Sequence, residues 1–360
     1  MDLTESEKRL LTLIGENPSH TRWELLQELN YKRPTTLSSK MSELKKAGYI
    51  RGPYYHINLN AVCETPVYSI LAEIRFSPSH YDVVFKSILC IDCWEWIFPT
   101  IQGETLFAFF RSCDCSHLHR LLNVLRNEGV IEYRSYTSQN RWFVQNPDFS
   151  GSVFPQTSDL FRSVDIELCY PDKTHNTAWQ FIDLKVMQYL QVRTTSIAEI
   201  QKLEKSLHGR FWRRHQIKHS IKKITEAGIA ERKHYNISPF PRGEDYAFLL
   251  LIEGDSLDVL QFISSFGRGC RLYKAFTMSG GTGFLWCWCS PQVGPTLMKR
   301  LDNLRPRIEA RCLPLKSRGH GDTLKKSFNE EYFDLEKQKW TFHFKKCKEE
   351  IEKVMERKNE

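Results

Sequence analysis

The sequence predicts an α+β protein: two repeats of a winged helix-turn-helix domain followed by a βαββαβ ferredoxin-like domain, with a C-terminal helical tail. Three observations predict this class. The chain matches itself at a nearly constant offset, each copy opens with helical periodicity, and each copy continues with strands and helices in the order βαββαβ. Its 360 residues, 41% of them hydrophobic, suffice for several folded domains.

The internal repeat rests on three pairs of segments that match in the same order along the chain. The pairs are 44–57 with 224–237, 102–112 with 280–290, and 131–134 with 308–311. In the first pair, Ala47-Gly48 meets Ala227-Gly228 and Tyr55 meets Tyr235. Each match is weak by itself. Together, at offsets of 180, 178 and 177 residues, they indicate one duplicated unit.

Three helices open the first copy. Thr4 with Glu7, and Thr21 with Glu24, have the spacing of a capping box, in which two side chains satisfy free backbone N–H groups at a helix start. Pro34 begins the third helix, since proline is tolerated in a first turn. Apolar residues follow each start at helical spacing, so each helix has one buried face.

A predicted wing follows the helices. Gly48 ends the third helix, because glycine readily adopts the left-handed conformation after a C-cap. The segments 49–50 and 54–59 flank Gly52-Pro53, which predicts a short β-hairpin. Three helices and a hairpin form a winged helix-turn-helix domain, and its second copy is expected over residues 182–237.

The rest of each copy alternates strands and helices in the order of a split βαβ unit. In the first copy we expect strand 67–76, helix 81–89, strands 94–101 and 105–111, helix 117–126 and strand 130–136. In the second copy we expect strand 246–252, helix 257–266, strands 271–278 and 283–289, helix 296–304 and strand 308–313.

These elements define six segments. They are winged domain 1 (1–60), ferredoxin-like domain 1 (61–145), a linker (146–180), winged domain 2 (181–241), ferredoxin-like domain 2 (242–315) and a charged helical tail (316–360). An apolar stripe in the tail favours a helix docked on its own domain over a coiled-coil dimer strand. Its members are Trp340, Phe344, Cys347, Ile351 and Val354.

The charge distribution favours a polyanionic partner. The net charge is +8, and residues 201–235 hold ten Lys/Arg against three Asp/Glu, whereas residues 1–60 hold nine against seven. No apolar run is long enough to span a bilayer, and the N-terminus lacks the apolar core of a signal peptide. We therefore expect a cytoplasmic protein with no membrane contact, whose 11 cysteines are reduced thiols.

This plan resembles the leucine-responsive regulatory protein (Lrp/AsnC) family. The resemblance rests on Ala47-Gly48-Tyr49-Ile50 before the wing and on Gly103 before an apolar strand, with Gly280-Gly281 in the corresponding place of the second copy. It covers nearly the whole chain except the linker and tail. It implies DNA binding by the third helix of each winged domain, sheet-to-sheet pairing of ferredoxin-like domains and, in some members, a small-molecule effector.

The chain departs from this family in carrying both units on one polypeptide, whereas family members usually carry one unit and dimerise. The usual dimer would then be an internal pseudo-dimer. The two halves have diverged, which leaves the effector pocket in doubt, and no ligand residue is carried over. A further homo-dimer, through the ferredoxin-like domains or the tail, stays open.

The candidate DNA-binding residues lie on the third helices and in the wings, where hydroxyl, cationic and amide side chains can contact phosphates or base edges. In the first copy they are Thr35, Thr36, Ser38, Ser39, Lys40, Lys45 and Arg51. In the second copy they are Arg210, Arg213, Arg214, Gln216, Lys218, His219, Lys222, Arg232 and Lys233. A solvated helix face is the alternative interpretation of the same pattern.

Several cysteines have the spacing of metal ligands. The candidates are Cys90, Cys93, Cys113 and Cys115. The repeat alignment places Cys287 over Phe109 and Cys289 over Arg111, so the two C-x-C pairs are not equivalent. Free cysteine is commonly a small buried apolar residue, and we predict no metal and no cofactor.

The predicted function is a sequence-specific regulator of transcription that binds double-stranded DNA and is not an enzyme, because no catalytic motif is present. Two alternatives stay open. A replication initiator of plasmid type also carries two winged domains in tandem. Some proteins built on this winged-helix and ferredoxin-like plan act on tetrapyrroles, which would need a pocket lined by histidine and arginine. His117, His119 and Arg120 lie close together in the sequence.

Overall fold

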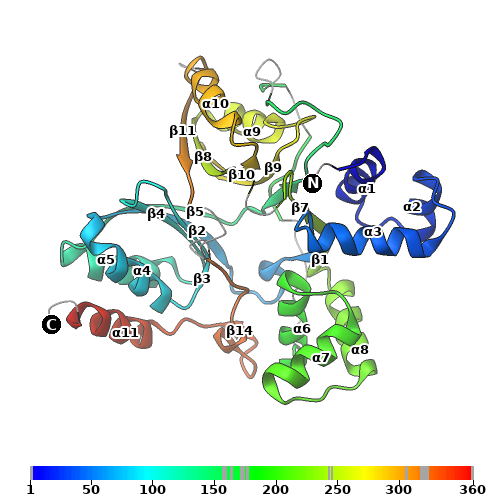
Figure 1. The fold of residues 1–360 in the computed structure, drawn as a ribbon. Helices are drawn as coiled ribbons and strands as arrows, with labels where there is room; N and C mark the ends of the chain where they lie inside the picture. The colour runs from blue at the N-terminus through cyan, green and yellow to red at the C-terminus, as the bar shows by residue number, and fades with distance from the viewer. Residues whose placement is uncertain are drawn as a thin grey trace. The chain divides into compact units, whose positions relative to one another are not determined.

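The computed structural model describes residues 3–155, 160–162, 165–170, 175, 178–241, 244, 246–304, 307–316 and 324–357. The chain divides into two compact units, and each unit draws on both halves of the sequence. Unit 1 comprises Met1–Tyr55, Asn140–Leu168 and Arg232–Gly319. Unit 2 comprises His56–Gln139, Cys169–Glu231 and His320–Glu360. Each unit thus joins the helices of one winged domain to the βαββαβ domain of the other half (Figure 1).

The predicted α+β class is confirmed, with antiparallel sheets and eleven α-helices in the described residues. No helix in that part of the chain combines the length and the apolar character that a membrane crossing requires.

Unit 1 begins with α1 (Glu5–Glu16), α2 (Arg22–Glu28) and α3 (Pro34–Lys46). Both predicted capping boxes, at Thr4 and Thr21, are present. The three helices share one apolar core around Leu10, Leu26 and Leu44. Phe149 and Ile237, from distant parts of the chain, complete this core.

The predicted wing is wrong. No hairpin forms at Gly52-Pro53; residues Ile50–Ile57 are one strand, β1, paired with β7 (Ala230–Ile237). Gly52 has a positive φ of +101°, and the strand continues through it without a turn. The physical reason is that β7 satisfies the backbone groups of β1 from about 180 residues away, and local turn signals cannot reveal a partner so distant.

The rest of unit 1 is a sheet with two helices. Its elements are β6 (Phe143–Gln145), β8 (Tyr246–Gly254), α9 (Ser256–Ser265), β9 (Tyr273–Ser279), β10 (Thr282–Cys289), α10 (Val293–Asp302) and β11 (Ile308–Pro314). The strand order is β11-β8-β10-β9-β6. The predicted end of ferredoxin-like domain 1 at residue 145 is therefore corrected, because β6 pairs with β9 of the second domain.

Unit 2 holds the other sheet and the second set of winged-domain helices. Its first elements are β2 (Tyr68–Arg75), α4 (Tyr81–Cys90), β3 (Trp94–Pro99), β4 (Thr105–Ser112), α5 (Cys115–Asn127) and β5 (Glu132–Ser138). Then come α6 (Phe181–Val192), α7 (Ile197–His208) and α8 (Arg214–Glu226). The strand order is β12-β3-β4-β2-β5, and α4 and α5 pack on one face of this sheet.

The C-terminal segment of unit 2 is more than the charged helix that the sequence predicts. Its elements are β12 (Leu324–Lys325), a 3-10 turn (Glu330–Tyr332), β13 (Phe333–Asp334), β14 (Lys339–Trp340) and α11 (Phe344–Glu356). β12 extends the sheet beside β3, and α11 buries Cys347 and Ile351 against α4 and α5. Trp340, which we assigned to the helical stripe, lies in a β-hairpin that precedes the helix.

Candidate active site

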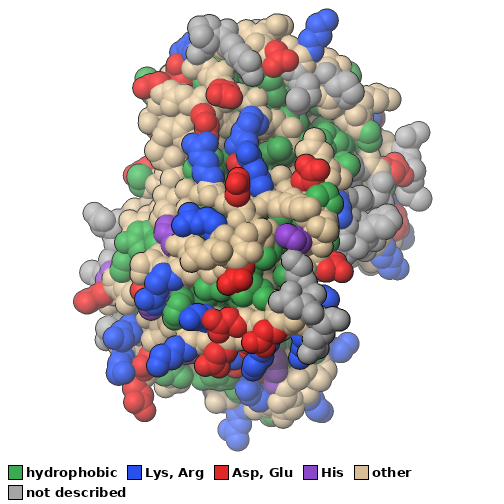
Figure 2. All heavy atoms as spheres, turned by 90° about the vertical axis from the view of Figure 1, so that its left-hand side faces the viewer, with side chains coloured by type: hydrophobic (Ala, Val, Ile, Leu, Met, Phe, Trp, Pro, Cys, Tyr) green, Lys and Arg blue, Asp and Glu red, His purple; other side chains and the backbone are tan. Residues whose placement is uncertain are grey.

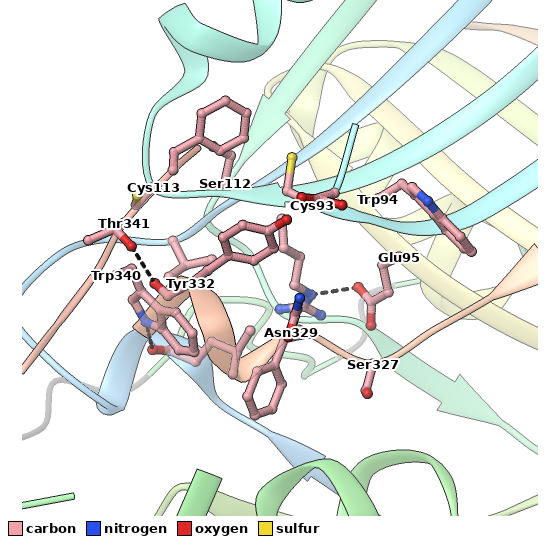
Figure 3. Close-up of a pocket in the computed structure, with 16 residues that line it drawn as sticks. Cys93, Trp94, Glu95, Ser112, Cys113, Ser327, Asn329, Tyr332, Trp340 and Thr341 are labelled. Atoms are coloured by element: carbon pink, nitrogen blue, oxygen red, sulfur yellow. Dashed lines mark hydrogen bonds and ion pairs between the residues drawn. The ribbon is translucent and has the colours of Figure 1, made fainter. Parts of the chain in front are cut away.

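A pocket of about 500 Å³, its open mouth included, lies in unit 2 between one edge of the sheet and the C-terminal segment (Figure 3). The start of β3, the end of β4, the 3-10 turn and the hairpin that carries Trp340 all line it. Because β3 and β4 are antiparallel neighbours, the start of one and the end of the other lie side by side.

A β-bulge shapes the floor of the pocket. The register of β3 against β4 shifts between Trp94 and Trp96, which leaves Glu95 out of the ladder. Such a bulge re-aims the side chain that it carries. The Glu95 carboxylate accepts a hydrogen bond from Nε of Arg111 on β4 at 2.6 Å. The site therefore has a fixed cation and a fixed carboxylate at its base.

The ion pair is largely buried, with each side chain 12% exposed. Burial disfavours the charged guanidinium, but the attraction of Glu95 and Tyr170 and their hydrogen bonds outweigh it, so the pKa of Arg111 is raised. Burial also raises the pKa of Tyr170, against the opposing effect of Arg111. On α6, Gln191 Nε2 donates to Glu95 at 3.4 Å. Arg111 thus stays charged and is held in place from two sides.

Aromatic rings form the walls. Trp340 makes edge contacts with Phe328 and Phe333, at centroid distances of 5.6 and 5.0 Å. Its Nε1 donates to the Leu59 carbonyl at 3.4 Å. Trp94 also lines the pocket; its Nε1 donates to the Leu89 carbonyl at 3.3 Å, and the Lys326 ammonium lies 4.3 Å from its ring centroid. Aromatic side chains thus line the pocket together with a few polar and charged groups, as is common in small-molecule sites.

Two of the metal-ligand candidates, Cys93 and Cys113, line this pocket. Burial raises the pKa of both thiols, so they are protonated at neutral pH and are weak nucleophiles. The other two, Cys90 and Cys115, pack against the core under the helices, and burial raises their pKa as well. In the described part of the chain no group of three or more His, Cys, Asp or Glu side chains could hold a metal ion.

The three residues proposed for a histidine- and arginine-lined pocket do not form one. His117 lies 5.4 Å from the Phe344 ring and 3.2 Å from the Asp114 carboxylate. His119 hydrogen-bonds Ser135 at 3.1 Å, and Arg120 lies 4.1 Å from the centroid of Phe344. His117 and Arg120 of α5 thus contact α11 through the ring of Phe344.

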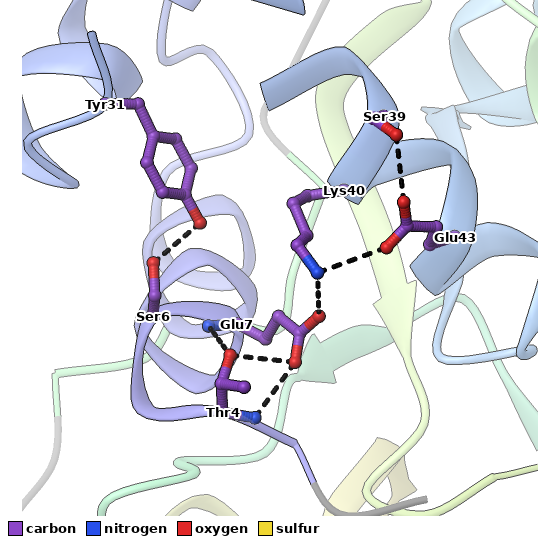
Figure 4. A network of polar contacts seen from close by, with 7 residues as sticks. All are labelled: Thr4, Ser6, Glu7, Tyr31, Ser39, Lys40 and Glu43. Atoms are coloured by element: carbon purple, nitrogen blue, oxygen red, sulfur yellow. Dashed lines mark hydrogen bonds and ion pairs between the residues drawn. The ribbon is translucent and has the colours of Figure 1, made fainter. Parts of the chain in front are cut away.

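The predicted DNA-binding residues of α3 are partly committed to other contacts. Thr35, Thr36, Ser38 and Lys45 are exposed. Ser39 donates to Glu43 at 2.8 Å, and Lys40 is paired with Glu7 at 3.0 Å and Glu43 at 3.2 Å (Figure 4). Two carboxylates compensate the charge of Lys40, so α3 offers little net positive charge.

Helix α8 presents a stronger cationic surface. Its exposed members from the predicted set are Arg213, Arg214, Gln216, Lys218, His219 and Lys222. Ile217 and Ile224 form the buried stripe of the same helix. The Gln216 side chain accepts from the backbone N–H of Arg213 at 2.8 Å, and so it caps the helix. Arg210 is bound by Glu204, at 3.8 Å, and lies over the Phe181 ring.

The predicted wing residues lie on the paired strands. Arg51 of β1 is half-buried, 5.9 Å from the Trp288 ring centroid. On β7, Arg232 is exposed and Lys233 is half-buried. On the face seen in Figure 2, Lys/Arg and Asp/Glu side chains are interspersed, without a large field of one sign. Among the predicted residues, those of α8 form the most cationic exposed set, which is the chemistry that a polyanion requires.

The pocket residues Arg111, Glu95, Tyr332 and Trp340 were not among the sequence candidates. No local motif joins them, because they come from three segments that only the fold brings together. The one available signal was the pair of tryptophans around Glu95.

No protein-family model matches the sequence, and no curated protein sequence matches it significantly. The fold is similar to the crystal structure of the siroheme decarboxylase NirDL in complex with an iron-uroporphyrin III analogue. The identity is 11% and the TM-score 0.50, over 98% of this chain and 99% of that chain. A second NirDL crystal structure gives 10% identity and a TM-score of 0.49 over 99% of this chain.

The crystal structure of the leucine response regulatory protein LrpA of Mycobacterium tuberculosis matches 39% of this chain, at 19% identity and a TM-score of 0.31. The likeness to NirDL at 11% identity shows the fold alone. It nevertheless contradicts the prediction that this chain is not an enzyme. That prediction rested on the absence of local catalytic motifs. NirDL, whose fold is similar over 98% of this chain, is an enzyme.

Proposed function

We propose that this protein is an enzyme that acts on a tetrapyrrole, with the pocket of unit 2 as the site of the reaction. The observation that carries the proposal is the likeness to NirDL over the full chain, both winged domains and the C-terminal segment included. The pocket offers aromatic side chains and the guanidinium of Arg111, which lies beside the carboxylate of Glu95 and shares the lining with that of Asp92.

Each part of the pocket has a role with such a ligand. A tetrapyrrole is flat and apolar at its centre and carries carboxylate arms at its edge. Trp340 offers apolar surface to a pyrrole ring, and the guanidinium N–H groups of Arg111 that do not bind Glu95 can donate to a carboxylate. The reaction class is the removal of carbon dioxide from such an arm.

The first prediction is that the full chain binds iron-uroporphyrin III and converts it to a product that has lost carbon dioxide. An absorbance titration measures the binding, and mass spectrometry measures the conversion. Ser327, which lines the pocket, gives a blocking variant: Ser327→Phe fills the site and weakens binding by about tenfold or more. Ser79→Phe places the same ring on an exposed turn outside the pocket and serves as the matched control.

Three outcomes separate the possibilities. Binding and conversion by the wild type, with loss in Ser327→Phe alone, support the proposal. Binding without conversion identifies an effector site and contradicts an enzyme. If the wild type does not bind iron-uroporphyrin III, the pocket is not a tetrapyrrole site.

Binding of double-stranded DNA by α8 is a second candidate function. The specific observation that favours it is the row of exposed Arg213, Arg214, Lys218 and Lys222 on one helix. We expect Arg213→Ala with Arg214→Ala to weaken binding strongly and to flatten its salt dependence, because phosphate contacts release counterions. Lys40→Ala should change little, because Glu7 and Glu43 already compensate its charge.

Fluorescence anisotropy tests this prediction, with DNA from upstream of the protein's own gene and a random duplex as the two ligands. Equal losses from the α8 and the Lys40 substitutions would show that α8 is not the contact surface. If the affinity of the wild type for DNA does not change with salt concentration, phosphate contacts are excluded.

A further inference from the structure

Tyr332 places a phenol inside the pocket. It ends the 3-10 turn Glu330–Tyr332, its side chain lines the pocket, and it is 7% exposed. Its hydroxyl points across the pocket toward Cys93 (Figure 3). Among the described residues, this hydroxyl has no hydrogen-bond partner. A buried hydroxyl without a partner costs stability, so its presence in a pocket suggests a ligand-directed role.

The turn that carries Tyr332 is held firmly. The Tyr332 carbonyl accepts from the backbone N–H of Thr341 at 2.6 Å and from its hydroxyl at 3.2 Å. The ring lies 5.1 Å from that of His343. The phenol is therefore fixed by its backbone and its ring, while its buried hydroxyl has no hydrogen-bond partner among the described residues.

Helix α6 of the second winged domain supports the same turn. Lys185 forms an ion pair with Glu330, and Gln188 donates to Glu330 and to the Phe328 carbonyl. Burial raises the pKa of Glu330, but the hydrogen bonds and charge of Lys185 and the bond from Gln188 prevail, so the pKa is lowered and the carboxylate stays charged. Lys185, Gln188 and Gln191 are three residues apart and share one helix face, and Gln191 reaches Glu95.

The other hydroxyl groups and the amide of the pocket are engaged or are weaker acids. Ser112 donates to the Asp114 carbonyl, and Thr341 donates to the Tyr332 carbonyl. The Asn329 amide is bound to Glu331. Ser327 carries an alcohol, which is a much weaker acid than a phenol. Tyr332 is thus the best-placed oxygen acid of this site.

We propose that Tyr332 is the proton donor of this pocket and that α6 of the second winged domain positions it. This inference rests on the proposed function. When the bond from an arm carbon to its carboxylate breaks, carbon dioxide leaves and the electron pair stays on the carbon. The Tyr332 hydroxyl gives its proton to that carbon and forms a new C–H bond. Water then returns a proton to the tyrosinate, so no oxidant or reductant is required.

The test compares conversion of iron-uroporphyrin III by matched variants of the full chain. Tyr332→Phe keeps the ring and is expected to lower kcat by about 10²–10⁴-fold with KM little changed. The thermal unfolding midpoint should stay equal or rise, because the variant removes an unpaired hydroxyl. Tyr133→Phe, on β5 outside the pocket, is the control and should keep kcat.

The positioning role of α6 has its own readout. Lys185→Met should lower kcat by about tenfold to a hundredfold, because the turn shifts, and Lys185→Arg should restore it. Lys337→Met removes an exposed ion pair with Asp334, at 3.6 Å, and should leave kcat unchanged.

The outcomes are distinct. A wild type that converts the substrate while Tyr332→Phe does so equally well overturns the donor role and leaves the proposed function standing. Equal kcat values for Lys185→Met and Lys337→Met overturn the role of α6. A wild type that converts nothing overturns the proposed function and the donor role together.

Discussion

Replacing Arg111 with Met is expected to lower the free energy of unfolding by about 3–5 kcal/mol. The Glu95 carboxylate, with its side chain 12% exposed, would lose its 2.6 Å partner and remain largely buried. The Tyr170 hydroxyl would lose its hydrogen bond to the same guanidinium. Urea denaturation of the full chain, followed by tryptophan fluorescence, measures the loss.

The control for this prediction is the double variant Arg111→Met with Glu95→Leu. Replacing a buried pair by apolar groups is often neutral, whereas removing one partner leaves an uncompensated charge. We therefore expect the double variant to recover most of the lost stability. If single and double variants are equally destabilised, the ion pair is not the source of the effect. Neither variant tests the reaction, because both alter the floor of the pocket.

Trp340→Ala is expected to cost about 3–5 kcal/mol, the usual range for a large aromatic side chain truncated in a core. Trp340 is 7% exposed, packs against Phe328 and Phe333, and donates to the Leu59 carbonyl at 3.4 Å. The truncation also removes a wall of the pocket, so affinity for iron-uroporphyrin III should fall with the stability.

Trp340→Phe separates the two effects. It keeps an aromatic ring in the wall and loses only the indole N–H and part of the packing, so we expect a smaller loss of stability and retained ligand binding. Denaturation curves and an absorbance titration give both quantities on the same samples. A Trp340→Ala variant with wild-type stability would mean that the hairpin does not anchor the C-terminal segment.

Helix α6, which the sequence assigns to the second winged domain, supports the pocket of unit 2 through its contacts. The face of α6 that carries Lys185 and Gln188 contacts the turn that ends at Tyr332. A helix set typical of DNA binding then supplies support to a pocket. The cationic residues of α8 are visible in the sequence and favoured a regulator, whereas the contacts of α6 appear only in the structure.

Local chemistry could be predicted well where the cause is local. The capping boxes at Thr4 and Thr21 are present, because each needs only residues three apart. The left-handed Gly48, at φ +83°, ends α3 for the same kind of reason. The wing failed because Gly52-Pro53 has the local composition of a turn, whereas the partner of that strand is β7.

The sequence by itself determined the α+β class, the order of helices and strands, and the cationic character of α8, since periodicity, caps and charge are properties of neighbouring residues. Only the tertiary structure decided that each unit joins the helices of one half to the sheet of the other. It alone brought Glu95, Arg111 and Tyr332 into one pocket. The physical reason is that the path of the whole chain sets contacts between residues more than 200 positions apart, and no local pattern records that path.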